Sequence, residues 1–159
     1  MRTLLTAVAM SALLALPAVA QTVQVVPMDD AEASGLSSAS LSEYVVAGCL
    51  GALFDGGLIC TNSRTVPGTL AGFAVYWPGP EVRGSYVDFL LLIFASYSGG
   101  AGGTVPPACS YRLVRLSDGV ELASGVVEAA APVSKDRVDV EKTCMAMGSD
   151  IAGRCLAVW

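Results

Sequence analysis

Long apolar segments alternate along the chain with short clusters of turn residues, and this pattern predicts a mainly β protein. Residues 85–97 are continuously apolar rather than alternating, which is typical of a central strand buried on both faces. Residues 110–116 and 120–127 flank a Ser-Asp-Gly turn and predict a hairpin. Further strands are expected from the shorter apolar runs at 70–77, 138–140 and 156–159. Strands at this spacing indicate an antiparallel β-sandwich or a small barrel.

One helix is expected ahead of most of these strands, packed on the sheet. Ser40 and Glu43 fit the capping-box pattern that opens a helix, and apolar residues follow at helical spacing. Two glycines at 56–57 then end it. Adjacent β-branched residues and several glycines inside this stretch suit a strand-and-turn path equally well, so both paths stay open. Residues 40–159 are expected to form a single β-rich domain.

The residues before this domain predict export. Arg2 supplies a positive charge, residues 4–16 are apolar, and Ala20 closes a small-x-small cleavage site. The apolar run is shorter than the roughly 18 residues that a membrane helix needs. We therefore expect a signal peptide over residues 1–20 and a mature protein in the periplasm or outside the cell. Residues 21–39 are rich in small and acidic residues and predict a flexible acidic arm.

Composition narrows the classes of function that fit. The chain of 159 residues has 9 basic and 14 acidic side chains, and loss of Arg2 with the signal would change the formal charge from −5 to −6. Such a chain repels phosphate backbones, so we expect no nucleic-acid partner, and insertion into a membrane is not expected either. The chain has no histidine, which removes Ser-His-Asp and Cys-His catalysis and histidine-ligated metals. We predict no catalytic residues, no metal and no cofactor.

The five cysteines predict a disulfide-bridged fold, since thiols tend to pair in an oxidising compartment. Two bridges among five cysteines allow fifteen arrangements. A C-x10-C spacing occurs twice, which favours the local pairs Cys49–Cys60 and Cys144–Cys155. Cys109 is then left as a free thiol, or as the link in a disulfide-bonded dimer.

Aromatic side chains next to turns suggest a role in binding. Tyr76, Trp77 and Tyr97 lie at or near predicted strand ends, and aromatic residues there are enriched in recognition surfaces. They could equally cap the core. We predict an exported non-enzymatic module that binds another protein or has a structural role in the envelope.

Two other classes of function stay open as alternatives. Asp139 and Glu141 are two residues apart beside Asp136, and in a strand they would share one face, as a histidine-free hydrolase with a carboxylate pair would require. Residues 154–159 resemble the terminal strand of outer-membrane barrels, which keeps a small outer-membrane β-barrel open. Strands that are apolar on both faces argue against such a barrel.

Overall fold

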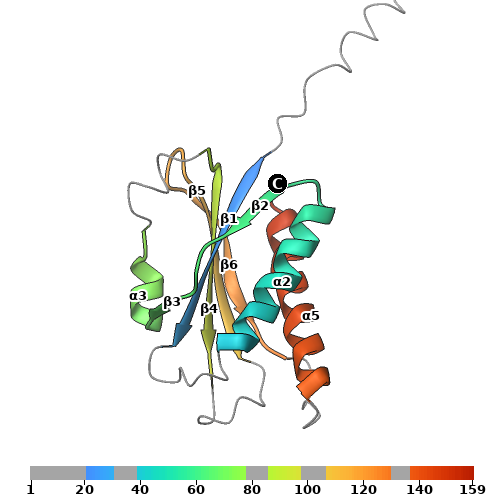
Figure 1. Ribbon diagram of the computed structural model, residues 1–159. Helices are drawn as coiled ribbons and strands as arrows, with labels where there is room; N and C mark the ends of the chain where they lie inside the picture. The colour runs from blue at the N-terminus through green and yellow to red at the C-terminus, as the bar shows by residue number, and fades with distance from the viewer. Residues whose placement is uncertain (1–20, 31–38, 78–85, 98–106, 130–136) are drawn as a thin grey trace, which may run out of the picture.

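The computed structural model describes residues 21–30, 39–77, 86–97, 107–129 and 137–159, and these form one mixed β-sheet with helices on it (Figure 1). The expectation of an antiparallel sandwich or small barrel is wrong. A single open sheet of six strands has the order β2-β1-β4-β5-β6, with β3 also paired to β1. In chain order the strands are β1 (Thr22–Asp30), β2 (Ile59–Asn62), β3 (Val66–Gly68), β4 (Phe89–Ser96), β5 (Ala108–Arg115) and β6 (Glu121–Val127).

The centre of the sheet is parallel and its far side is antiparallel. Strands β1 and β4 pair in parallel from Val23↔Phe89 to Asp29↔Ala95, and β2 and β3 also run parallel to β1. The β4, β5 and β6 strands form antiparallel pairs, as the hairpin prediction for 110–127 required. Strand β4 is buried along seven of its eight residues, which confirms a central strand covered on both faces.

Strand β1 replaces the first part of the flexible arm expected over residues 21–39. Its residues turn alternately to the two faces, with Val23 and Val25 in one buried cluster and Val26 and Met28 in the other. Burial of apolar side chains on both faces offsets the conformational entropy that this segment loses on ordering, although its small and acidic residues predicted a flexible arm. The rest of the proposed arm, at 31–38, and the proposed signal peptide at 1–20 lie outside the described residues.

Two long helices, α2 (Ala39–Asp55) and α5 (Arg137–Leu156), lie side by side on one face of the sheet (Figure 1). The expected helix after Ser40 is confirmed, and Gly57 follows its end with a φ of +87°, a conformation that glycine adopts without strain. Helix α5 is a correction, because 138–140 and 156–159 were expected to be strands. Its buried residues recur at helical spacing: Val140, Cys144, Met147, Ile151 and Cys155. None of the helices in the described ranges has the length and apolar character needed to cross a membrane.

A short helix, α3 (Leu70–Val75), lies on the other face of the sheet and corrects the strand expected at 70–77. The hydroxyl of Thr69 caps it by accepting a hydrogen bond from the Gly72 N–H at 3.1 Å. Phe73 is its buried anchor and packs against Phe94 of β4, with the ring centroids 5.7 Å apart. The Arg112 guanidinium of β5 donates to the carbonyls of Phe73 and Ala74 at 3.0 and 2.8 Å and so holds the end of this helix.

Two glycines let α2 and α5 approach each other at backbone distance. A Cβ atom added to Gly148 would lie 1.9 Å from the carbonyl oxygen of Val45, and one added to Gly48 would lie 2.0 Å from that of Met145. The Ser149 hydroxyl also donates to the Gly48 carbonyl at 3.3 Å. The helix pair therefore depends on the absence of a side chain at both positions.

The disulfide-bridged fold is also wrong, because all five cysteines are free thiols. Cys144 and Cys155 are eleven residues apart on α5, which separates them by about 16 Å along the helix axis, far beyond the span of a disulfide. Cys49 of α2 and Cys60 of β2 are not bonded either. Four of the thiols are fully buried, where cysteine acts as a small apolar side chain.

Candidate functional site

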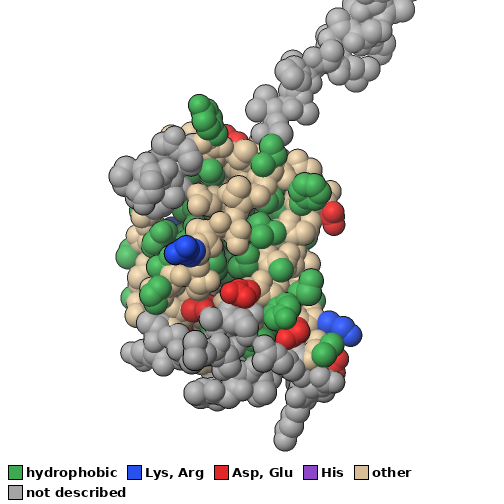
Figure 2. Space-filling view, in the orientation of Figure 1, with side chains coloured by type: hydrophobic (Ala, Val, Ile, Leu, Met, Phe, Trp, Pro, Cys, Tyr) green, Lys and Arg blue, Asp and Glu red, His purple; other side chains and the backbone are tan. Residues whose placement is uncertain are grey.

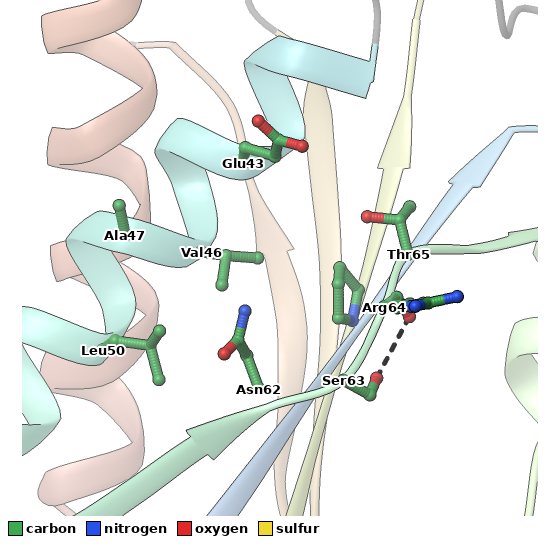
Figure 3. Close-up of a pocket in the computed structure, with 9 residues that line it drawn as sticks. Glu43, Val46, Ala47, Leu50, Asn62, Ser63, Arg64 and Thr65 are labelled. Atoms are coloured by element: carbon green, nitrogen blue, oxygen red, sulfur yellow. Dashed lines mark hydrogen bonds between the residues drawn. The ribbon is translucent and has the colours of Figure 1, made fainter.

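An open groove of about 570 Å³ lies between α2 and the segment that joins β2 to β3 (Figure 3). Helix α2 forms one wall with residues at positions i, i+3, i+4 and i+7, which share one side of a helix. Pro27 of β1 also lines the groove. The wall from α2 consists of Glu43, Val46, Ala47 and Leu50, and the facing wall consists of Asn62, Ser63, Arg64 and Thr65.

The groove exists because the edge of the sheet is interrupted at Pro27. Pairing with β1 stops at Val25↔Asn62 and resumes at Met28↔Val66, so three residues of the edge segment face two residues of β1. Proline has no N–H to donate to a neighbouring strand, and an extra residue makes a strand bulge away. The last ladder-like bond before the gap runs from the Ser63 N–H to the Val25 carbonyl at 2.9 Å.

The two walls differ in chemistry. Val46 and Leu50 give the helix wall an apolar surface, and the Glu43 carboxylate lies at one end of it (Figure 3). The Asn62 amide points into the space between the walls, whereas the Arg64 side chain points away from it (Figure 3). A molecule in the groove would therefore meet hydrocarbon on one side, amide and hydroxyl groups on the other, and a negative charge at one end.

A buried carboxyl lies close to this acidic end. Asp29 is two residues beyond Pro27 on β1 and only 4% exposed. One of its oxygens accepts a hydrogen bond from the Ser42 hydroxyl at 3.1 Å, and the other oxygen has no hydrogen-bond partner among the described residues. Burial raises the pKa of Asp29 to about 6; the hydrogen bond from Ser42 opposes this rise and the charge of Glu43 adds to it. Burial also raises the pKa of Tyr97, with a further contribution from the Asp29 charge.

The aromatic residues proposed for binding are not brought together. Tyr76 packs against the apolar cluster on the α3 side of the sheet, and Trp77 lies over the turn at Gly119 with 39% of its surface exposed. Tyr97 packs against the cluster on the opposite side, below α2 and α5. The three side chains therefore cannot form one recognition patch.

The other candidates from the sequence are also separated or enclosed. Asp139 and Glu141 lie on α5, where two residues are about 200° apart around the axis, so they do not share a face; Asp136 lies outside the described residues. Cys109 is fully buried in the core, where a second chain cannot reach its thiol to form a dimer. In the part of the chain that the structure describes, no three acidic or cysteine side chains gather as metal ligands.

Sequence reasoning missed the groove, although two local signals for it were present. A proline inside an apolar run marks a place where pairing on one side of a strand is weak, and Pro27 is such a residue. The apolar stripe over Val46, Ala47 and Leu50 could have been assigned to the core. Only the register of β2 and β3 on β1 shows that this stripe borders an opening.

No protein-family model matches this sequence, and no curated protein is recognisably similar to it. Solved structures do share its fold. A hypothetical protein, CT253 from Chlamydia trachomatis, is 11% identical with a TM-score of 0.51, over 87% of this chain and 97% of that one. TolB from Acinetobacter baumannii is 10% identical with a TM-score of 0.50, over 89% of this chain but only 29% of TolB. Lipoprotein GNA1162 from Neisseria meningitidis is 16% identical with a TM-score of 0.46, over 84% and 99% of the two chains. At these identities the likeness to CT253 and TolB shows the fold alone.

Proposed function

We propose that this chain is an exported envelope protein that binds another protein through the groove between α2 and residues 62–65. The charge, apolar run and cleavage site of residues 1–20 support export.

The observation that carries the binding proposal is the interrupted sheet edge beside an apolar helix wall. Residues 63–65 leave the strand ladder, and an edge of this kind can pair with an extended segment of another chain. The groove is also of the size of known binding pockets, which measure roughly 300–1,000 Å³.

An exposed apolar side chain extends this surface beyond the groove. Phe54, one helical turn after Leu50 on α2, is 71% exposed. A large apolar side chain left in water beside a groove is typical of surfaces that a partner covers. A protein segment would bury Phe54 together with the helix wall.

The experiment is site-specific photo-crosslinking in living cells of the protein's own host. A photoreactive amino acid replaces Ala47, which is exposed in the groove, and in the matched control it replaces Ala146, which is exposed on α5. We expect a protein adduct at position 47 and not at position 146, with the partner identified by mass spectrometry. Equal adducts at the two positions, or none at position 47, would refute the proposal. N-terminal sequencing of the same material should give Gln21, and a start at Met1 would refute export with cleavage.

A further inference from the structure

We infer that the groove receives a basic side chain, lysine or arginine, from a segment of the partner protein. This inference rests on the proposed function and adds the chemistry of the partner. A lysine or arginine side chain has a long hydrocarbon stem and a cationic head. The groove offers a surface for each part, with Val46 and Leu50 for the stem and Glu43 for the head.

The geometry of the groove places these surfaces in the right order. The three residues lie on one side of α2, with Glu43 one turn before Val46 and Leu50 one turn after it. The stem of a basic side chain would lie along the two apolar residues, and its head would reach the carboxylate at the end of the row. Opposite this row, the Asn62 amide points into the same space and can accept hydrogen bonds through its oxygen (Figure 3).

The charges around the groove favour a cation. Asp29 lies near Glu43 and is buried, and within the described ranges one of its oxygens has no hydrogen-bond partner, so its ionised form adds negative potential at the same end. The nearest basic residue in the lining, Arg64, directs its side chain away from the space (Figure 3). A cationic head in the groove would therefore meet the Glu43 carboxylate, with the buried Asp29 behind it, before it met another cation.

The charge of the whole molecule acts in the same direction. The formal charge of −5 attracts basic partners at long range and speeds their association. Figure 2 shows acidic side chains gathered on the lower part of the face that holds the groove. A partner segment with lysine or arginine would be drawn to this region before it made contact.

The test uses isotope-labelled protein purified from its own host and two short synthetic peptides. One peptide has a single lysine between glycines, and the other has norleucine in its place, which keeps the four-carbon stem and removes the charge. We expect the lysine peptide to shift the backbone amide signals of Val46, Leu50 and Asn62. We also expect binding to be about 1.5-fold to fivefold weaker with norleucine, which is the range of an exposed ion pair.

Two variants separate the groove from general electrostatic attraction. Glu43→Gln should weaken lysine binding by the same factor, and Asp55→Asn, which removes an exposed carboxylate from the end of the same helix, should leave it unchanged. Equal binding of the two peptides, equal effects of the two variants, or the absence of shifts in the groove would overturn the inference. If a partner still crosslinks at position 47 in that case, the protein-binding function stands and only the basic chemistry of the partner is refuted.

Discussion

A methyl group added at Gly148 is the sharpest test of how α2 and α5 pack. The Cβ of Gly148→Ala would lie 1.9 Å from the Val45 carbonyl oxygen, whereas ordinary contact begins at 3.4 Å. The two helices would have to separate by about 1.5 Å at this point. Backbone atoms cannot move aside by changing rotamer, so the strain must spread through the core between the helices and the sheet.

The size of the effect follows from two opposing terms. Overpacking a core typically costs about 1–3 kcal/mol, and we expect the upper end here because the clash is with backbone. Replacing glycine by alanine inside a helix returns about 0.5–1 kcal/mol. The variant should therefore lose about 2 kcal/mol of unfolding free energy, which is a shift of roughly 1 M in the urea midpoint for a protein of this size.

Gly153→Ala provides the matched control on the same helix. Gly153 is exposed and a Cβ there would meet nothing within 4 Å, so only the helix term applies and the variant should gain about 0.5–1 kcal/mol. Both variants are compared with the unmodified protein by urea unfolding followed by circular dichroism. If Gly148→Ala is as stable as Gly153→Ala, the helices do not touch at backbone distance and the packing described above is incorrect.

Three further predictions concern other parts of the fold. Arg112→Met removes the two hydrogen bonds to the carbonyls at the end of α3 and should destabilise the protein by about 1–2 kcal/mol, with a change in Trp77 fluorescence. The control Arg115→Met breaks only the exposed ion pair with Asp118 and should change stability by less than about 0.5 kcal/mol. Burial raises the pKa of Asp29 to about 6, so the contribution of this group to the free energy of unfolding is fully present below pH 3.8 and is lost as the pH rises through 6. Asp29→Asn should remove this fall in stability, which is about 3 kcal/mol. A profile of stability against pH that the substitution leaves unchanged would contradict the burial of Asp29. In a thiol-labelling assay the half-buried Cys60 should react first and the other four cysteines only on unfolding, whereas rapid labelling of all five would contradict the buried core.

The elements that could be predicted from the sequence are those with a complete local signal. Strand β4 is apolar along nearly its whole length, the β5–β6 hairpin has its turn residues, and α2 has a capping box at one end and glycines at the other. Each of these signals is contained within the element itself.

The elements that could not be predicted depend on distant parts of the chain. Strand β1 is buried only because β2 and β4 flank it. The acidic residues at its end favoured the prediction of a flexible arm, although the rest of the strand is mostly apolar. Helix α5 has Val138 and Val140 near its start and the apolar run 156–159 at its end, and both stretches suggest strands when read alone. The candidate site was missed for the same reason, because the groove depends on the register of β2 and β3 against Pro27.

The position of β1 also determines when the fold can be completed during synthesis. It is the first described strand, yet all three strands that pair with it come later in the chain, and its Thr22 bonds to Asp88, 66 residues away. Helix α5, which packs against α2, β5 and β6 and completes the larger core cluster, is made last. The ribosome therefore releases β1 long before the strands that flank it and before the helix that completes the core, so the core forms only when all of these elements are available. We infer that folding is slow and cooperative, because long-range contacts must form together.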